Sequence, residues 1–498
     1  MKKSLTEQVL NNSIWFFLNS LMKRVIALAF TIVLVRLLLP EKFGIYSLAL
    51  SIAMIFLGLG DLGIDQAFTI FFSKYINKEP EKANSYFNYL FKIKISLIFI
   101  LSLILGLSAY IFAKYIFKQP ELLKILPISA VYIFFFSLSG FFSCFFYIYK
   151  KVKLDFIKET LFQVIRLVLV LLIIKILPQE YSIVGIFFSL LLTSVIVLLF
   201  SVYYSKKLYP ILFSKSETRI DKKRIFKFLF YLLIGSISFI IFSEIDIFML
   251  GLFLKDLKFI GYYRAVFTLI IGVWGVISVT PVLLPIFSAI GKIRLKKAVD
   301  KVLKITFMFS IPAIFGVLIL GRYIIRLIYG IEYLEGAFLL NFLAFLIFSE
   351  VTINLLIGVL SSREKPRFVA KSLLIAIILN IVLDYFLIKS LLNISSLWAT
   401  AGAAIATLVT RYIFMFSIMF YANKECGIKI KANYIIKPLI ASLAMAAALY
   451  LIAHKIDVGI ISGLLIITLG IFVYFLVLYL IRGIKKQDLK ILKSNAKA

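Results

Sequence analysis

The sequence predicts an all-α, polytopic membrane protein. Two observations lead to this prediction: the amino-acid composition and the alternation of apolar and charged segments. Of its 498 residues, 62% are hydrophobic and only 16% are charged, and the mean hydropathy is +1.05. Soluble domains are nearer ~45–50% apolar and ~25% charged, so a soluble chain of this composition could not cover its surface with polar groups. Long apolar runs alternate with short basic clusters. The runs far exceed the ~9–11 residues of a membrane barrel strand, which leaves helices.

The apolar runs define the membrane spans in order. A bilayer core needs ~20 apolar residues per helix, and this window predicts about fourteen spans. No short apolar core with a small-residue cleavage site opens the chain, so we expect the first run to be a membrane helix and not a signal peptide. The predicted spans are 12–39, 43–72, 91–116, 124–149, 156–177, 183–204, 226–253, 259–290, 303–326, 336–360, 369–391, 396–421, 434–453 and 458–481.

The charge distribution predicts the orientation of these spans. The chain has 56 Lys and Arg against 24 Asp and Glu, a formal net charge of +32. With alternating connections, about 39 of the bases fall on one side, which the positive-inside rule places in the cytoplasm. We therefore expect a multi-pass protein of the cell membrane, in contact with membrane lipids and with both termini cytoplasmic. The bases do not form one wettable face, so no nucleic-acid partner is expected.

An internal repeat predicts the domain organisation. Gly44 and Gly261 open two corresponding spans, and Gly185 and Gly402 lie in two others at the same spacing of 217 residues. A duplicated six-helix unit keeps its orientation, so the halves are two parallel lobes related by an axis along the membrane normal. The predicted parts are an N-terminal six-helix lobe (1–204), a basic cytoplasmic linker (205–225), a C-terminal six-helix lobe (226–421), and an extra helix pair with a basic cytoplasmic tail (422–498).

Three sequence motifs resemble those of a known family, and they occur along the chain in the same order as in that family. The stretch 34–49 contains an Arg-Leu-Leu-Leu-Pro turn followed by Phe-Gly-Ile-Tyr, and 246–251 with 261–265 and then 329–333 follow it. They resemble the polysaccharide-transport flippases of the superfamily that includes the MATE exporters and the lipid II flippases (the MOP exporters). Leu39 stands where that family normally has Gly. The resemblance covers about the first 420 residues and implies lobes of six helices, fourteen helices in all, and flipping of a lipid-linked glycan.

Bases at membrane depth are the candidate substrate ligands. A charge near the bilayer centre costs ~2.5–3.5 kcal/mol on insertion scales, so it usually faces the bundle interior. Guanidinium and ammonium groups suit a phosphate or pyrophosphate. We expect Lys23, Arg24, Arg36 and Arg166 to bind the headgroup of a polyprenyl-(pyro)phosphate-linked glycan. Snorkelling to the interface is the alternative for Arg36, and Arg411 is expected to line the cavity or to pair with an acid.

Acids at membrane depth have two interpretations. Asp61 and Asp65 are four residues apart and share a helical face, beside glycines that predict a break or close packing. Acids could bind a coupling ion, H⁺ or Na⁺, or they could neutralise the buried bases. No metal centre is expected. The candidate acids are Asp61, Asp65, Glu244, Asp246, Glu350 and Asp384.

The sequence favours a transporter over an enzyme. The one histidine, His454, lies near a span end, and no glycine-rich phosphate loop follows a strand, so neither a catalytic centre nor a cofactor is expected. A membrane glycosyltransferase or polymerase would need a sizeable outer loop, which the short connections do not supply. The predicted function is flipping or export of a polyprenyl-linked oligosaccharide or polysaccharide precursor by alternating access. The alternative is a MATE-type, cation-coupled antiporter of small-molecule drugs.

Overall fold

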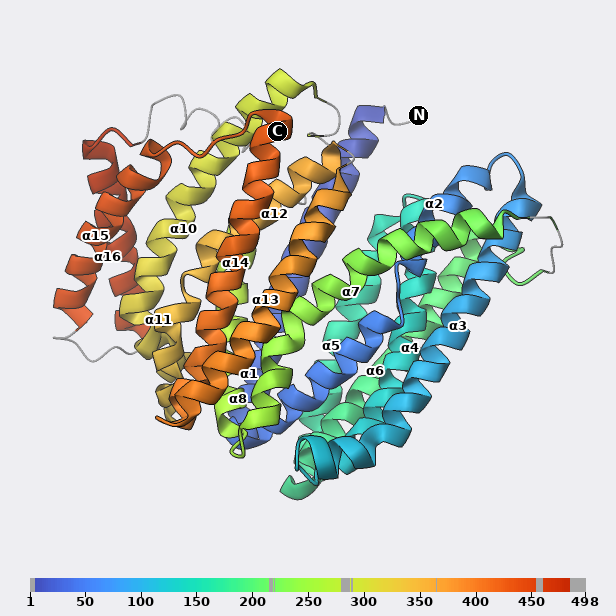
Figure 1. Cartoon of the computed structure of the whole chain (residues 1–498), viewed down its shortest axis with the longest axis horizontal. Coiled ribbons are helices and arrows are strands. Elements are labelled where there is room, and N and C mark those ends of the chain that lie inside the picture. The colour runs from blue at the N-terminus through green and yellow to red at the C-terminus, as the bar shows by residue number, and fades with distance from the viewer. Residues whose placement is uncertain are drawn as a thin grey trace. The chain divides into compact units, whose positions relative to one another are not determined.

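A computed structural model of the chain describes residues 5–214, 218, 220–278, 287, 290–363, 365–453 and 460–483. All regular structure in these ranges is helical (Figure 1), which confirms the all-α class. Each predicted span overlaps a helix, and residues 279–286 of the predicted span 259–290 lie outside the described part of the structure. Among the described residues, ten helices are long and apolar enough to cross a membrane, or up to eleven if one bent helix pair is one span. The first of these, 26–75, contains the predicted span 43–72 and part of the predicted span 12–39, so fourteen crossings stay a prediction.

The helices group into two compact units. The first unit is Met1–Arg264 with Ala370–Ala406, and the second is Ala265–Val369 with Thr407–Ala498. The predicted lobes, which follow the sequence repeat, stay a prediction. The first unit contains α1 (Leu5–Leu59), α2 (Ile64–Tyr75), α3 (Pro80–Ile111), the π-helical η1 (Phe112–Ile116), α4 (Leu122–Ile148), α5 (Val152–Ile176), the 3₁₀ turn η2 (Gln179–Tyr181), α6 (Ser182–Leu208), α7 (Lys222–Phe253) and nearly all of α13 (Pro366–Leu392).

The second unit is built around a long helix, α10. Two helices, α8 (Lys258–Ile277) and α14 (Ser396–Cys426), begin in the first unit and end in the second. The 3₁₀ segment η3 with α11 meets α12 at a bend of 52°. The other helices of this unit are α10 (Lys292–Ile328), η3 (Ile331–Leu339), α11 (Leu340–Leu343), α12 (Leu346–Ser362), α15 (Asn433–Ala453) and α16 (Ile460–Leu480).

Two interruptions shape the start of the first unit. α1 is kinked at Leu39, which has φ 60° and ψ 169°, directly before Pro40. Proline removes an amide donor and ends a regular helix, so the kink follows from the sequence. α1 then ends at Leu59, and residues 60–63 form a turn in which Leu62 and Gly63 have positive φ. The predicted glycine-linked break is therefore present, and it places Asp61 between the two helices.

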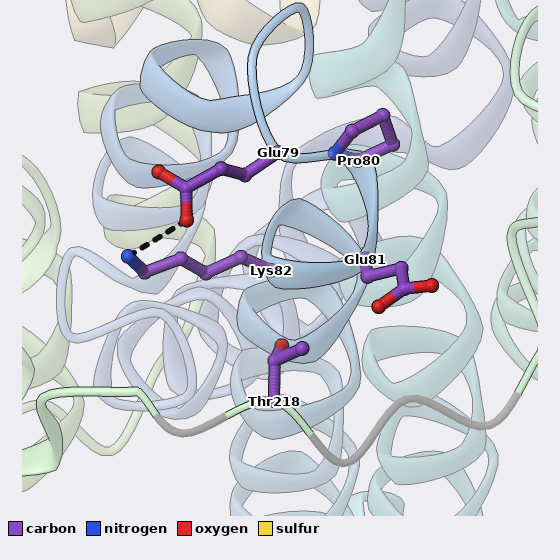
Figure 2. Close-up of a pocket in the computed structure, with 5 residues that line it drawn as sticks. All are labelled: Glu79, Pro80, Glu81, Lys82 and Thr218. Atoms are coloured by element: carbon purple, nitrogen blue, oxygen red, sulfur yellow. Dashed lines mark hydrogen bonds and ion pairs between the residues drawn. The ribbon is translucent and has the colours of Figure 1, made fainter.

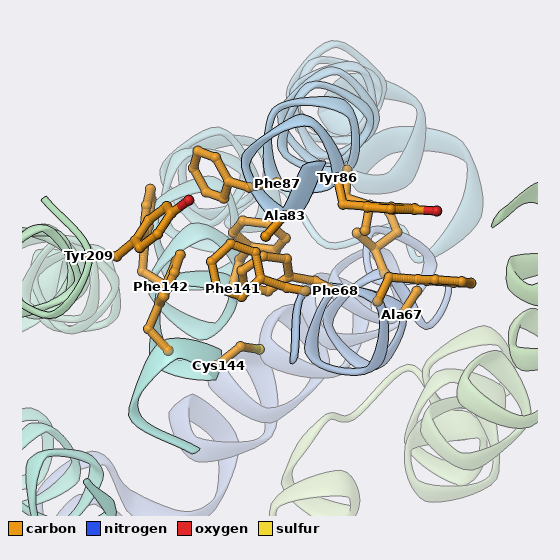
Figure 3. Packing of buried hydrophobic residues seen from close by; sticks show 14 of the residues in the cluster. Ala67, Phe68, Ala83, Tyr86, Phe87, Phe141, Phe142, Cys144 and Tyr209 are labelled. Carbon is orange, nitrogen blue, oxygen red and sulfur yellow. The ribbon is translucent and has the colours of Figure 1, made fainter. Parts of the chain in front are cut away.

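An aromatic core fixes α2, α3 and α4 to one another (Figure 3). Phe68 of α2 lies 4.7 Å from Phe141 and 5.1 Å from Phe145 of α4, between ring centroids. Phe87 of α3 closes the group at 5.9 Å from Phe68. Buried aromatic pairs add about 0.5–1.5 kcal/mol each beyond area burial. This core therefore holds α2, α3 and α4 in fixed positions, and with them the polar residues that lie one helical turn from the aromatic side chains.

Glycines allow close backbone crossings at corresponding places in the repeat. A Cβ added to Gly44 would collide with the carbonyl of Leu257, and one added to Gly261 would collide with the carbonyl of Pro40. The kink of α1 and the start of α8 thus pack reciprocally through the two glycines that mark the repeat in the sequence. No side chain larger than hydrogen fits at either position without a shift of backbone.

The C-terminal helix pair packs on α10 (Figure 1). α15 and α16 contact each other along their length, and Leu320, Met445 and Leu449 belong to their shared apolar core. The Tyr474 hydroxyl of α16 donates to the carbonyl of Met308 in α10 at 2.7 Å. The extra pair is therefore an integral part of the second unit.

Candidate functional site

Asp61 and Asp65 form one ion-pair network with a lysine of α3. The Lys94 ammonium lies 2.9 Å from a carboxylate oxygen of each, and its side chain is only 1% exposed. Both carboxylates remain about one third exposed, at 33% and 29%. Lys94 lies near the start of the predicted span 91–116 and 33 residues from Asp61, so its contact with the two acids could not be predicted from sequence spacing. One ammonium group shared by two carboxylates leaves this network with a net charge of −1 when all three groups are ionised.

Arg166 of α5 packs against aromatic rings, whereas Lys94 pairs with two acids. Its guanidinium lies over the Phe30 ring of α1 at 3.8 Å and near the Phe162 ring at 5.2 Å. Among the described residues it forms no ion pair, and its buried Nε has no hydrogen-bond acceptor. The aromatic face compensates part of the desolvated charge. Arg166 is therefore a half-buried cation with donors left for an anionic ligand.

The other predicted bases lie on α1. The side chains of Lys23 and Arg24 lie outside the described part of the structure, although their backbone belongs to α1. Arg36 is exposed and precedes the Leu39 kink by less than one turn. The role of all three as headgroup ligands stays a prediction.

Asp246 and Asp384 meet in a buried polar network of the first unit. The Tyr263 hydroxyl of α8 donates to Asp246 of α7, and the Asn380 amide of α13 donates to Asp246 at 3.4 Å and to Asp384 at 3.2 Å. Asn380 and Asp384 are fully buried. The Oδ1 atoms of both have no hydrogen-bond donor in the described structure. A buried network with two carboxylates, in which two oxygen atoms lack a donor, suits a small cation or a proton.

Asn380 and Tyr263 are site residues that the sequence analysis missed. Asn380 stands in an apolar run four residues before Asp384, which puts both on one helical face. A polar side chain at that depth is a usable signal. Tyr263 carried no such signal, because tyrosine is common in apolar runs.

The remaining candidate acids are paired with arginines. Glu244 of α7 receives the Arg264 guanidinium of α8 at 2.8 Å, with both side chains nearly buried. In the second unit, Glu350 of α12 lies 3.1 Å from Arg411 of α14. The structure thus places Arg411 in a pair, one of its two expected roles. Removal of one partner from such a pair is strongly destabilising, and the pair leaves less free charge for a ligand.

A further buried cluster joins α4 and α5. The Lys158 ammonium lies 2.9 Å from Glu159 and 3.4 Å from Asp155, and it donates to the Ser143 hydroxyl at 2.9 Å. The Tyr147 hydroxyl donates to Asp155 at 2.6 Å. Lys158 lies near the start of the predicted span 156–177, and its side chain, which is 9% exposed, belongs to this cluster.

Cavities in the described structure differ in polarity. One of about 580 Å³ lies where α3 begins (Figure 2), and there Lys82 pairs with Glu79 at 3.0 Å. One of about 440 Å³ is almost wholly apolar and lies among α10, α15 and α16, with Gly316 and Gly470 in its wall. A third, of about 530 Å³, contains Arg322 and Arg326. Within the described ranges, no group of three His, Cys, Asp or Glu residues could hold a metal ion.

The helices and their order match those of a class of solved membrane proteins that contains flippases and transporters. The structure of the lipid II flippase MurJ in its inward closed conformation matches with a TM-score of 0.74 at 19% identity, covering 93% of this chain and 98% of that one. An inward-facing multidrug MATE transporter of the MOP superfamily matches with a TM-score of 0.62 at 13% identity, covering 83% and 98%. The chain therefore has the fold of this class of proteins, as the resemblance implied.

The sequence identifies the family within that class. Residues 9–291 match the family described as polysaccharide biosynthesis protein, and the chain belongs to this family. The probable low-salt glycan biosynthesis flippase Agl15 of Haloferax volcanii is 24% identical over 283 residues, which are 53% of this chain. The match spans 56% of that relative's length.

Proposed function

We propose that this membrane protein flips a polyprenyl-(pyro)phosphate-linked oligosaccharide or polysaccharide precursor across the cell membrane by alternating access. The family and the name of the Haloferax relative, a probable glycan biosynthesis flippase, support a glycan substrate. The observation that carries the proposal is Arg166, a half-buried guanidinium that forms no ion pair in the described structure. A phosphate oxygen would supply the acceptor that its Nε lacks. Lys23, Arg24 and Arg36 are proposed to bind the same headgroup.

The alternative, a MATE-type drug antiporter, needs acids that can bind a cationic drug. Asp61, Asp65, Glu244 and Glu350 each lie within 3.1 Å of a base. Acids paired with a base attract a cationic drug less strongly than unpaired carboxylates do, and this pairing favours the glycan flippase.

The Asp246–Asp384 network supports a site for a coupling ion, H⁺ or Na⁺. Its orphan oxygens on Asn380 and Asp384 point to a positive species that completes the network. Binding of that species would change the charge balance among α7, α8 and α13. A step of this kind could link an ion gradient to movement of the lipid-linked substrate.

The test of the headgroup role is a comparison of two bases on α5. In cells that lack the native gene, Arg166→Gln should accumulate lipid-linked glycan on the inner leaflet, whereas Lys175→Gln should not. Lys175 is exposed on the same helix and forms no ion pair in the described structure, so it controls for loss of charge. Arg166→Lys should restore part of the export. Full export by Arg166→Gln at wild-type protein levels would remove the proposed role.

The test of ion coupling uses purified protein in proteoliposomes. Asp384→Asn and Asp246→Asn should remove the dependence of transport on a Na⁺ or pH gradient and leave binding of the lipid substrate in place. Asp256→Asn, at an exposed acid between α7 and α8, is the control. Transport that ignores both gradients in the wild-type protein would contradict coupling at this network.

A further inference from the structure

Two arginines one turn apart line a cavity at the C-terminal end of α10. Arg322 and Arg326 are exposed to it, and Tyr323, Leu334 and Tyr450 complete much of its wall, in a volume of about 530 Å³. α10 and α15 lie side by side here (Figure 1). The Tyr323 hydroxyl donates to the carbonyl of Ala453 at 3.0 Å and fixes this end of α10 to α15. The cavity thus has a rigid frame.

The two guanidinium groups have no described partner that would balance their charge. Within the described part of the chain, neither Arg322 nor Arg326 forms an ion pair or a hydrogen bond, and no acid lines the cavity. This differs from Arg264 and Arg411, which each pair with a glutamate. Like charges four residues apart on a helix destabilise it, so the pair reduces stability unless an anion joins it.

The spacing of the two arginines and the side chains around them indicate which kind of anion the cavity would bind. Four helical residues rise about 6 Å, so two guanidinium forks can hold the oxygens of one phosphate or pyrophosphate from two sides. The rest of the wall is apolar or aromatic, with Leu318, Ile319 and Ala453 beside the tyrosines. Tyrosine and arginine beside apolar side chains are typical of the membrane interface, where a phosphate carries an acyl or prenyl chain.

We propose that Arg322 and Arg326 form a binding site for the phosphate headgroup of a lipid. The site is separate from Arg166, and it does not depend on the proposed transport function. On the predicted orientation this end of α10 lies at the outer leaflet, opposite its basic start at Lys292. The phosphate could come from a bulk anionic phospholipid or from a polyprenyl-linked glycan.

The experiment measures lipid binding to the full-length protein in detergent by native mass spectrometry. Phosphatidylglycerol should bind at least tenfold more tightly than phosphatidylcholine, and the double variant Arg322→Gln with Arg326→Gln should lose that preference. Arg294→Gln is the matched control, because Arg294 is an exposed arginine at the other end of α10 with no ion pair in the described structure. Its preference should equal that of the wild type.

Further measurements separate the sources of the phosphate and guard against misfolding. A polyprenyl pyrophosphate that displaces phosphatidylglycerol at equal concentration identifies the lipid-linked substrate as the preferred occupant. Failure to displace it identifies the bulk phospholipid, and displacement by millimolar inorganic phosphate alone would overturn a lipid site. The variant Arg322→Lys with Arg326→Lys should fold and keep part of the preference. Equal binding of phosphatidylglycerol by the wild type and a folded Gln variant would overturn the proposal.

Discussion

Leu39 adopts a backbone conformation that glycine normally occupies. Its φ of 60° with ψ of 169° lies in a region that is nearly restricted to glycine, and residues held there carry about 1–3 kcal/mol of strain. The side chain is 52% exposed, so few contacts compensate. The related flippases that this turn resembles normally have Gly at this position. The sequence comparison therefore marked the one residue of α1 that the structure shows to be strained.

Leu39→Gly should stabilise the protein by about 1 kcal/mol. The relief of strain exceeds the roughly 0.5–1 kcal/mol that a glycine loses through its more flexible unfolded state. Leu37→Gly, at a similarly exposed leucine with ordinary helical geometry, should instead destabilise by about 1 kcal/mol. Unfolding by denaturant in detergent measures both. A loss of stability in both variants would contradict the strained geometry at Leu39.

Lys94→Met should destabilise the first unit by about 2–3 kcal/mol. The change leaves Asp61 and Asp65 without their shared cation, and such losses reach about 3–5 kcal/mol when the acids are fully buried. The partial exposure of both carboxylates lowers the expected effect. Adding Asp61→Asn and Asp65→Asn should restore most of the stability. Lys92→Met, at an exposed position on the same helix, should change it little, and an equal loss in both lysine variants would rule the network out.

Residue types at membrane depth were predictable, but their partners were not. Each candidate acid stands out in an apolar run, and Arg166 does so as well. Lys94 lies 33 residues from Asp61, and Arg264 lies 20 residues from Glu244, so only the packing of separate helices reveals each pair. A single sequence carries no record of that packing.

At the scale of elements, periodicity and breaks predicted most of what the structure contains. Every predicted span overlaps a helix, and the predicted interruption near Gly60 is present as a turn. The boundary between the predicted spans 12–39 and 43–72 is present as the kink at Leu39, directly before Pro40. The bend between η3 with α11 and α12 was not predicted, since hydropathy does not distinguish 3₁₀ from α-helix.

Gly44→Ala and Gly261→Ala should each destabilise the crossing of α1 and α8 by about 1–3 kcal/mol. In both cases the new methyl group meets a backbone carbonyl, which cannot rotate away as a side chain does. Gly316→Ala is the control, because nothing lies within 4 Å of its added Cβ. That variant should be neutral or more stable by up to about 1 kcal/mol, because alanine favours helix. Thermal unfolding in detergent compares the three, and three equal midpoints would refute the tight crossing.

At the scale of the molecule, the predicted orientation can be tested with single cysteines. Cys144 and Cys426 are both buried and can be replaced by serine to give a background without thiols. In intact cells, a membrane-impermeant maleimide should label Asn393→Cys, between α13 and α14, but not Lys206→Cys, near the end of α6. Permeabilised cells should show labelling at both exposed positions. The reverse pattern would place the termini outside.

The ion pairs of the described residues bear on how fast the protein can work. Three of them join groups of the same unit: Lys94 with Asp61, Arg264 with Glu244, and Arg411 with Glu350. Rupture of a buried pair adds several kcal/mol to an activation barrier, and each 1.36 kcal/mol slows a step tenfold. A rearrangement that leaves these three pairs intact avoids that delay, and its rate would not depend on their rupture.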